Sequence, residues 1–463
     1  MTIDNAINLA YIVAFALFIY GLMGLTGPKT AVRGNKIAAA GMAIAVVATL
    51  VSIRDTGNWF LIAAGIAVGV LLGIPPAKYT KMTAMPQLVA LFNGVGGGTV
   101  ALIAWAEFNG SHGFRGEPVY VVAGSLFGAI VGSVSFWGSL IAFGKLQESI
   151  PGRPIGIGRL QQPLNIALLI ASVALAICIG ISDGGSSYLM LAILCFAAAL
   201  GLMVVLPIGG ADMPVVISLL NALTGLSAAA AGLALNNTAM IVAGMIVGAS
   251  GSILTNLMAK AMNRSILAIV AGGFGGTVTA SAISEHGPVK ATSAADAAIQ
   301  MAYANQVIVV PGYGMAVAQA QHAVKDMASL LESKGVPVVY AIHPVAGRMP
   351  GHMNVLLAEA EVSYDALKEM DDINGEFART DVTLVIGAND VTNPAARNDP
   401  SSPIHGMPIL NVDQSRSVIV LKRSMNSGFA GVENPLFFAP QTSMLFGDAK
   451  KSVGAVIEEL KAL

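Results

Sequence analysis

Long apolar runs follow one another through the first 260 residues of the chain, with short polar stretches between them. A run can cross a bilayer as a helix when it holds about 20 mostly apolar residues. By that measure the chain has nine spans, at residues 7–26, 37–54, 57–75, 84–106, 119–144, 164–182, 187–208, 213–234 and 238–259. The pattern therefore predicts an α-helical polytopic membrane domain over residues 1–260.

The pattern changes after residue 305, where short apolar runs alternate with amphipathic ones. Val307–Val310 is predicted to be a buried strand, the turn Gly312-Tyr313-Gly314 follows it, and a helix continues through about Lys334. Alternating strands and helices predict a Rossmann-like α/β domain, a doubly wound parallel sheet, over residues 306–463. Further strands are expected at 336–342, 381–387, 417–421 and 442–446, and further helices at 353–361 and 450–463.

Residues 261–305 join the two parts of the chain. The run Gly272-Gly273-Phe274-Gly275-Gly276 and the Ser-, Thr- and Ala-rich stretch at 277–298 are typical of a hinge or linker. Its place between a membrane domain and a nucleotide-binding type of fold makes this linker a candidate coupling element.

The composition agrees with a membrane protein. Charged residues make up 11% of the chain, hydrophobic residues 55%, and the mean hydropathy is +0.72, whereas an ordinary soluble domain is about 25% charged. The net charge of −1 gives no reason to expect a nucleic-acid partner. Cys178 and Cys195 lie in apolar runs, so we expect small apolar residues there, with no disulfide and no metal site.

Positive charges between the spans predict the orientation of the chain. Only Arg54 and Arg115 fall on the side opposite the C-terminal domain, which places that domain in the cytoplasm and the N-terminus in the periplasm. The first run lacks the basic residues of a signal peptide and the arginines of a transit peptide, so we expect a bacterial inner-membrane protein. The cations on the cytoplasmic side are Lys29, Arg33, Lys36, Lys78, Lys81, Lys145, Arg153, Arg159, Lys260 and Arg264.

An internal repeat relates the fourth and eighth predicted spans. Met85–Asn93 is echoed by Met213–Asn221 at an offset of 128 residues and in the same direction, which indicates a parallel duplication. A membrane asparagine most often forms hydrogen bonds between helices, but two at equivalent places favour a polar path lined by Asn93 and Asn221. Two glycine series are predicted to serve helix packing, namely Gly124, Gly128 and Gly132, and Gly244 and Gly248.

Residues just after each predicted strand are site candidates, because ligands of doubly wound sheets bind at the carboxyl ends of the strands. Gly312-Tyr313-Gly314 fits a dinucleotide-binding turn, although Val317 stands at the third fingerprint position, and an ordinary βα turn remains open. After the second strand no Asp or Glu is present for a ribose 2′-OH, and Arg348 stands there instead. The pair Lys422-Arg423 after the strand at 417–421 suits an additional phosphate, which favours NADP over NAD.

Five long motifs occur along the C-terminal part of the chain, namely Val310–Gln321, Ile342–Gly351, Gly387–Asp390, Lys422–Met425 and Gly447–Lys451. Together they resemble the β subunit of proton-translocating NAD(P) transhydrogenase. The resemblance covers the whole chain, since the paired Met-Pro spans and Ala261–Ser265 also match. It implies that the C-terminal domain binds NADP(H), that a partner α subunit binds NAD(H), and that hydride passes directly between the two nicotinamides. It further implies coupling to protons (NADH + NADP+ + H+ outside giving NAD+ + NADPH + H+ inside).

The resemblance also assigns residues to the NADP(H) site. Lys422, Arg423 and Ser424 are expected to hold the 2′-phosphate, and Asp390 is expected near the nicotinamide as a positioning residue. The segment Asn426–Glu433 is expected to cover the cofactor, with Phe429 where related sequences often have tyrosine. The expected cofactor-binding residues are Gly312, Tyr313, Gly314, Met315, Ala316, Val317, Gly347, Arg348, Met349, Pro350, Gly387, Ala388, Asn389, Asp390, Val391, Thr392, Asn393, Lys422, Arg423, Ser424, Met425, Gly428, Phe429 and Ala430.

In the membrane domain, the expected proton path includes Asn93, Asp212, Asn221 and Ser250. Family members with a two-subunit organisation often carry a histidine in the first Met-Pro span, where this chain has Asn93. None of the predicted spans contains a histidine. We therefore expect a separate membrane α chain to supply the proton-binding histidine, within a dimer of the whole complex.

Two other classes of protein stay open from the sequence. A transporter or channel with an NAD(P)-sensing domain requires a selectivity filter or a charged substrate site in the spans, and neither is visible. A structural membrane subunit with a vestigial Rossmann domain has no reason to keep Gly312, Gly314, Asp390 and the Lys422-Arg423 pair. Hydride transfer with no side-chain nucleophile or base is the preferred prediction, because the cofactors carry the chemistry.

Overall fold

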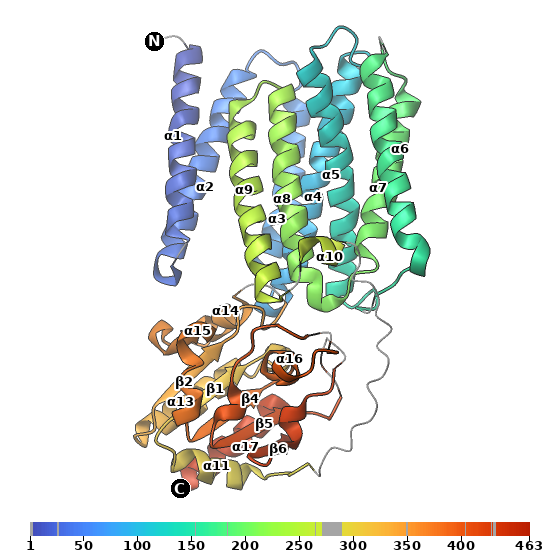
Figure 1. Cartoon of the computed structure of the whole chain (residues 1–463). Coiled ribbons are helices and arrows are strands. Elements are labelled where there is room, and N and C mark those ends of the chain that lie inside the picture. Colours follow the sequence, from blue (N-terminus) through green and yellow to red (C-terminus); the bar gives the residue numbers. More distant parts are fainter. Residues whose placement is uncertain are drawn as a thin grey trace. The chain divides into compact units, whose positions relative to one another are not determined.

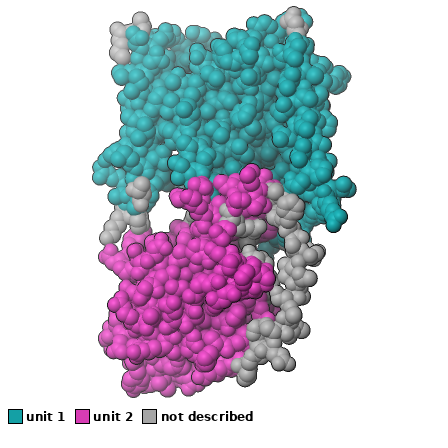
Figure 2. Space-filling view, viewed as in Figure 1, with its two compact units in different colours: residues 1–207, 216–255 teal, residues 208–215, 256–463 magenta. Residues whose placement is uncertain are grey.

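The computed structural model describes residues 3–25, 27–152, 154–182, 184–263, 265–270, 289–348, 351–402, 404–426, 428 and 432–463. The chain divides into two compact units, each with its own set of internal contacts (Figure 2). Unit 1 comprises residues 1–207 and 216–255, and unit 2 comprises residues 208–215 and 256–463.

Nine helices among the described residues are long and apolar enough to cross a membrane, which confirms the predicted polytopic architecture (Figure 1). The second begins at Pro28, well before the predicted start, because proline at the first helical turn gives up no hydrogen bond. The helices are α1 (Ile3–Gly24), α2 (Pro28–Ser52), α3 (Trp59–Tyr79), α4 (Met85–Gly110), α5 (Val119–Leu146), α6 (Gln161–Ile181), α7 (Ser187–Val205), α8 (Met213–Ala234) and α9 (Thr238–Ala261).

Glycines bring the helices of unit 1 into close contact, as the glycine series predicted. A Cβ at Gly132 of α5 would lie 2.6 Å from the carbonyl oxygen of Gly97 in α4. A Cβ at Gly244 of α9 would lie 2.6 Å from the carbonyl oxygen of Gly225 in α8. Close backbone approach of this kind replaces the hydrophobic driving force that helices lack inside a bilayer.

A six-stranded parallel sheet forms the centre of unit 2 and confirms the predicted Rossmann-like class. Its order is β3-β2-β1-β4-β5-β6, and β1 and β4 are buried along their whole length, as strands covered on both faces must be. The short edge strand β3 was not predicted. The strands are β1 (Val307–Pro311), β2 (Val338–Ile342), β3 (Leu367–Glu369), β4 (Val382–Ile386), β5 (Ser417–Lys422) and β6 (Thr442–Phe446).

The helix predicted after the glycine turn is two helices in the structure. Helix α12 (Tyr313–Val317) ends near Gln319, whose φ of 51° is left-handed and ends a right-handed helix, and α13 (Gln321–Ser333) then begins. The predicted single helix was therefore wrong at this point. The other helices of the domain are α14 (His352–Glu359), α15 (Met370–Ile373), α16 (Ala395–Asn398) and α17 (Ala449–Ala462).

The segment assigned to the linker contains ordered elements at both ends. Helix α10 (Ile266–Val270) begins it, and α11 (Ala294–Ala302) packs against α17 near its end. Between them, the Thr292 N–H donates to the Met444 carbonyl of β6 at 2.9 Å, so the chain joins the free edge of the sheet. The Gly272–Gly276 run lies outside the described residues.

The strand order reverses between β1 and β4, which sit side by side although β2 and β3 separate them in sequence. The connection that follows β1 runs toward β2, on one side of β1 in the sheet, whereas β4 lies on the other side of β1. At such a switch point a crevice opens at the carboxyl ends of the two strands. The turns after β1 and β4 lie at this crevice, and the turns after β2 and β5 flank it. The fold thus gathers the predicted site segments at one edge of the sheet.

Candidate functional site

The turns after β1 and β4 pack backbone against backbone. A Cβ at Gly312 would lie 2.4 Å from both the Cα of Ala388 and the carbonyl oxygen of Gly387, a separation that no side chain tolerates. Gly387 itself has a φ of 66°, and its own Cβ would lie 2.4 Å from the Cα of Gly314. Glycine is required here because the two turns approach more closely than a methyl group allows.

Hydrogen bonds fasten the two turns together. The Gly312 N–H donates to the Ile386 carbonyl at 2.9 Å, and the Gly314 N–H donates to the Gly387 carbonyl at 3.0 Å. The sequence pattern alone predicts that the N–H groups of such a turn receive a pyrophosphate. In the structure these two N–H groups donate to carbonyls of the neighbouring turn and are not free for a ligand. The contribution of the glycine turn is therefore the shape that its backbone gives to the crevice.

Arg348, after β2, lies over the aromatic ring of Tyr313 from the glycine turn. Its guanidinium carbon is 4.4 Å from the ring centroid, a distance at which a cation is attracted to the ring face. The structure therefore brings together a cation and an aromatic ring that are 35 positions apart in the sequence. Both side chains are partly exposed at the crevice.

Lys422, the last residue of β5, is held by several groups. Its Nζ donates to the Asn426 carbonyl at 2.5 Å and lies 4.6 Å from the centroid of the Phe437 ring. Partial burial lowers the pKa of the Lys422 ammonium, and the charge of Asp390 opposes that shift. Its neighbour Arg423 is exposed. The strand end thus presents one fixed and one solvated cation.

The segment after β5 is tied to the turn after β4. Gly428 lies so close to that turn that a Cβ there would be 2.6 Å from Asn389 Nδ2 and from an oxygen of Asp390. The Asn434 amide donates to the Asn389 carbonyl at 3.0 Å, and the Asn393 amide donates to the Glu433 carbonyl at 3.1 Å. These contacts bring Gly428 and Glu433, two of the described residues of the predicted covering segment, against the turn after β4.

The predicted cofactor residues fall into three groups by their exposure in the structure. Several are buried in the body of their turns, several are partly or fully exposed, and four lie outside the described residues. The buried ones are Gly312, Met315, Ala316, Ala388, Val391, Thr392 and Asn393. The partly or fully exposed ones are Tyr313, Gly314, Val317, Gly347, Arg348, Gly387, Asn389, Asp390, Lys422, Arg423, Ser424, Met425 and Gly428. Met349, Pro350, Phe429 and Ala430 lie outside the described residues.

Three residues of this site were not predicted. Phe437 and Asn434 lie well beyond the strand end, and only tertiary contact brings them to Lys422 and Asn389. His352 follows directly on the motif Ile342–Gly351, and no role was predicted for it. An Asn-Pro pair before an aromatic run, at Asn434–Phe437, is a capping signal that indicates an ordered turn.

Asn93 is buried inside unit 1, where its amide reaches a second helix. Asn93 Nδ2 donates to the hydroxyl of Ser139 at 2.9 Å and to that of Ser135 at 3.3 Å, both in α5. The Ser135 hydroxyl in turn lies 2.5 Å from the hydroxyl of Thr224 in α8. A chain of polar groups therefore connects α4, α5 and α8 across the interior of the unit.

The other residues predicted for the proton path have different surroundings. Asn221 lies on an exposed face of α8, although it is the repeat equivalent of buried Asn93. Ser250 is also exposed, and its hydroxyl donates to the Val247 carbonyl at 3.3 Å. Asp212 belongs to unit 2 and is buried, with 7% of its surface exposed. The two halves of the repeat are thus not equivalent in environment.

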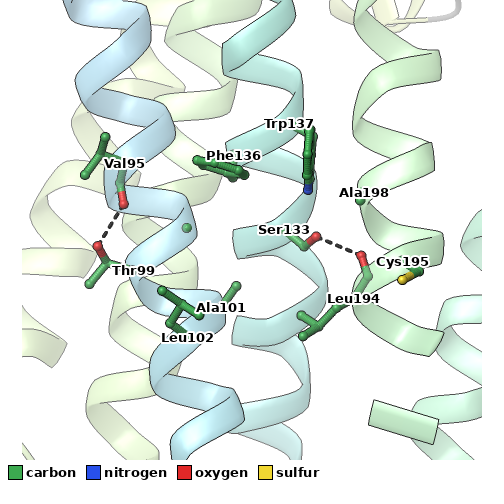
Figure 3. Close-up of a pocket in the computed structure, with 11 residues that line it drawn as sticks. Val95, Thr99, Ala101, Leu102, Ser133, Phe136, Trp137, Leu194, Cys195 and Ala198 are labelled. Carbon is green, nitrogen blue, oxygen red and sulfur yellow. Dashed lines mark hydrogen bonds between the residues drawn. The ribbon is translucent and has the colours of Figure 1, made fainter. Parts of the chain in front are cut away.

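A groove of about 480 Å³ lies between α4, α5 and α7 and is separate from this chain of polar groups. Figure 3 shows that its two hydroxyls are already used: Thr99 donates to the Val95 carbonyl and Ser133 to the Leu194 carbonyl. Its lining includes none of the residues predicted for the proton path. The groove is apolar in character, as expected for a surface that meets lipid or another helix.

The crevice residues fit a phosphorylated dinucleotide. The glycine turns after β1 and β4 pack too closely for a Cβ between them, and Arg348, Lys422 and Arg423 supply positive charge. Asn389 Nδ2 is buried and has no hydrogen-bond partner among the described residues, which leaves a donor for a ligand. The turn after β2 holds no carboxylate that would repel a 2′-phosphate.

These features define a class: a multi-pass membrane protein that carries a Rossmann-type domain with a cationic crevice at its strand ends. The family model for the NAD(P) transhydrogenase beta subunit matches residues 7–459. The NAD(P) transhydrogenase subunit beta of Rhodospirillum rubrum is 50% identical over 459 residues, which cover 97% of this chain and 98% of that protein. A strain-specific sequence from the same organism matches to the same extent. The chain belongs to the NAD(P) transhydrogenase β-subunit family.

Family membership confirms the resemblance drawn from the motifs. It connects the chain to transhydrogenase activity, to NAD(P)(H) and to α-subunit partners. Transhydrogenase activity therefore replaces the two other classes that the sequence left open.

Proposed function

We propose that this chain binds NADP(H) in its C-terminal domain and exchanges hydride directly with NAD(H) held by an α subunit. The single observation that supports this best is the placement of Lys422 and Arg348 at two strand ends beside the glycine turns, with no carboxylate after β2. Cations in that arrangement suit the 2′-phosphate that distinguishes NADP from NAD. The nicotinamides supply the hydride chemistry when they are bound.

Each part of the crevice then has a task. Lys422, Arg423 and Ser424 bind the 2′-phosphate, and Arg348 with the Gly312–Val317 turn lies along the rest of the dinucleotide. Asp390 positions the nicotinamide, and Gly428 lets the covering segment close on Asn389 and Asp390. The protein binds, orients and covers one nucleotide, and the α subunit brings the other.

The direct test uses the full-length chain purified in detergent. We expect NADP(H) to co-purify, and we expect hydride transfer when an NAD-binding α subunit and NADH are added. Nucleotide content is measured by chromatography after denaturation, and transfer by absorbance with a reducible NADP analogue. Absence of any bound or bindable NADP(H) contradicts the proposal.

Removal of both strand-end cations is expected to change nucleotide preference. A charge-assisted hydrogen bond contributes about 1.5–3 kcal/mol, so Lys422→Ala with Arg423→Ala weakens NADP(H) by roughly 100-fold or more. NAD(H) lacks the 2′-phosphate, so its weak binding should change by less than about threefold. Isothermal titration of both nucleotides into the full-length chain gives the two ratios.

The matched control for this pair removes the same charge elsewhere in the domain. Lys325→Ala with Lys334→Ala, both on or next to α13 and away from the strand ends, should leave both affinities unchanged. Equal losses for NADP(H) and NAD(H) in the Lys422/Arg423 variant would mean that these cations do not bind the 2′-phosphate.

Proton translocation is proposed to pass through the membrane domain near Asn93, Asp212, Asn221 and Ser250. The buried chain from Asn93 through Ser135 to Thr224 supports a polar route. One proton crossing about 100 mV releases about 2.3 kcal/mol, and a tenfold change in a nucleotide ratio corresponds to about 1.4 kcal/mol. One proton per hydride is therefore enough to drive NADP+ reduction by NADH, with the 261–305 linker as the coupling element.

Asn93→Leu is expected to stop proton pumping while NADP(H) still binds. Leucine removes both bonds to α5 and leaves the Ser139 hydroxyl without its donor, which interrupts the polar chain. Pumping is measured with a pH-sensitive dye in vesicles that contain the whole complex. Thr99→Val, in the same helix but bonded to its own backbone, is the control.

Unchanged pumping in Asn93→Leu would exclude this residue from the path. Asn221→Leu answers the same question for the exposed position on α8, because retained pumping and retained reverse transhydrogenation exclude Asn221.

The partner chains follow from what the spans lack. The predicted spans of this chain contain no histidine, so we propose that a separate membrane α chain supplies the proton-binding histidine. We also propose a dimer of the whole complex in a bacterial inner membrane, with the C-terminal domain in the cytoplasm.

A further inference from the structure

His352 is buried directly behind the turn that carries Arg348. It is the first residue of α14, and only 1% of its surface is exposed. Its Nδ1 accepts a hydrogen bond from the backbone N–H of Arg348 at 3.0 Å. A buried acceptor that binds a single backbone N–H fixes the position of that residue more firmly than packing alone.

The turn is shaped to allow this bond. Gly347 has a φ of 109°, and a Cβ at Gly347 would lie 2.4 Å from His352 Nδ1. Any other residue would push the imidazole away from the Arg348 N–H. Gly351 also has a positive φ, of 65°, but a Cβ there would meet nothing within 4 Å. The close contact is therefore specific to Gly347.

The protonation state of His352 suits an acceptor at Nδ1. Burial, together with the charge of Arg348, lowers the pKa of His352 to about 4. The neutral ring carries its proton on Nε2, because Nδ1 receives the Arg348 N–H, and this tautomer is assigned from the hydrogen bond. Nε2 has no partner among the described residues, so the Nδ1 bond is what orients the ring.

Three side chains, those of Tyr313, Arg348 and His352, lie together at the crevice. The His352 ring lies 6.4 Å from the Tyr313 ring at an angle of 46°, and the Arg348 guanidinium lies 4.4 Å from the same Tyr313 ring. His352 thus contacts both partners of the cation–ring pair, one through its hydrogen bond and one through its ring. The buried imidazole connects the turn after β2 to the glycine turn after β1.

We propose that His352 is a positioning residue for the bound dinucleotide, which holds the Gly347-Arg348 turn so that Arg348 stays over Tyr313 before the nucleotide arrives. The inference rests on the proposed function, in which Arg348 lies along NADP(H). A side chain that is already fixed loses little conformational entropy on binding, so its contact with an anion is stronger. His352 itself touches no nucleotide, and its effect passes through Arg348.

The first test compares two substitutions that differ in one acceptor. Asparagine places its Oδ1 close to where histidine has Nδ1, whereas leucine has a similar volume and no acceptor. Loss of one buried hydrogen bond is expected to weaken NADP(H) binding by the full-length chain roughly fivefold to tenfold in His352→Leu. His352→Asn should stay within about twofold of the parent protein.

The second test asks whether the effect passes through Arg348. In an Arg348→Ala background, His352→Leu should cause no further loss of NADP(H) affinity, because the group that it positions is gone. The same factor of loss in both backgrounds, or equal losses in His352→Leu and His352→Asn, would overturn the inference. If Arg348→Ala alone leaves NADP(H) affinity unchanged, the assignment of Arg348 in the proposed function fails instead.

A glycine pair keeps the test decisive if His352→Leu does not fold. Gly347→Ala and Gly351→Ala both strain a positive φ, but only the first displaces His352. Gly347→Ala is expected to weaken NADP(H) binding by at least about fivefold more than Gly351→Ala. Equal affinities in these two variants would contradict a role for the His352 contact.

Discussion

Gly312→Ala is expected to abolish NADP(H) binding within the measurable range, a loss of about 100-fold or more. The added methyl would lie 2.4 Å from the Ala388 Cα and from the Gly387 carbonyl oxygen, which are backbone atoms without rotamers to relax. Either the turn after β1 or the turn after β4 must move, and the bond from the Gly312 N–H to Ile386 breaks. Because these turns border the crevice, its shape is lost.

The consequence for folding is measurable in the same sample. Overpacking of this kind costs about 1–3 kcal/mol, so hydrogen exchange in β1 and β4 should accelerate while exchange in the membrane helices does not change. Gly454→Ala in α17 is the matched control, because its Cβ meets nothing within 4 Å. If the NADP(H) affinity of Gly312→Ala stayed within about threefold of that of the parent protein, the close packing of the turns after β1 and β4 would not be what shapes the nucleotide site.

The spans and the sheet could be predicted from the chain because their signals are periodic and local. A run such as Val119–Leu146 is apolar for longer than any soluble helix requires, and Val307–Val310 is buried on both faces, as its β-branched residues indicate. The edge strand Leu367–Glu369 was missed because it is three residues long and half exposed. Pairing with β2 alone makes it a strand.

The interruption of the helix at Gln319 could not be predicted from local sequence patterns. Alanine, glutamine and methionine are all good helix formers, so the sequence favours one helix through this region. Instead α12 ends at Val317 and α13 begins at Gln321, and the Ala320 N–H between them donates to the Met315 carbonyl. A left-handed Gln319 is a consequence of tertiary packing, which propensity does not record.

Some residues of the candidate site could be predicted from local sequence, and others depend on tertiary contacts. Glycine turns and strand-end cations are local features, so Gly312, Lys422 and Arg348 could be found before the structure was known. His352 and Phe437 act through contacts with residues that precede them, and nothing in their own segments indicates this. The repeat predicted equal roles for Asn93 and Asn221, but one is buried and the other exposed, because sequence similarity does not fix which face of a helix meets a neighbour.

Acidification is expected to destabilise the nucleotide-binding unit before its carboxylates titrate. Burial lowers the pKa of His343 to about 4, although its bond to the Pro408 carbonyl opposes this, and burial with the charge of Arg348 does the same for His352. An unfolded chain takes up a proton on each near pH 6.5. Between pH 6.5 and pH 4 the unfolded state therefore binds more protons, and the free energy of unfolding falls as the pH falls.

The expected loss is large because two residues act in the same window. With these pKa values each histidine removes roughly 2 kcal/mol of stability at pH 5 relative to neutral pH, or roughly 4 kcal/mol together. Asp381, whose pKa is held down chiefly by hydrogen bonds from Asn305, loses its contribution only below its ordinary value of 3.8. The interval from pH 6.5 to pH 4.5 thus isolates the histidines.

The measurement is hydrogen exchange in rising urea at pH 7 and pH 5, read on peptides that cover β1 and β4 of the full-length chain and corrected for intrinsic exchange. His343→Gln keeps an amide N–H for the Pro408 carbonyl, and His352→Asn keeps the acceptor for Arg348, so each should remove about half of the pH dependence. His322→Gln, at an exposed position of α13, should change nothing. A urea midpoint that is the same at pH 7 and pH 5 in the parent protein would show that the two imidazoles gain protons without unfolding, and that their burial is weaker than the structure indicates.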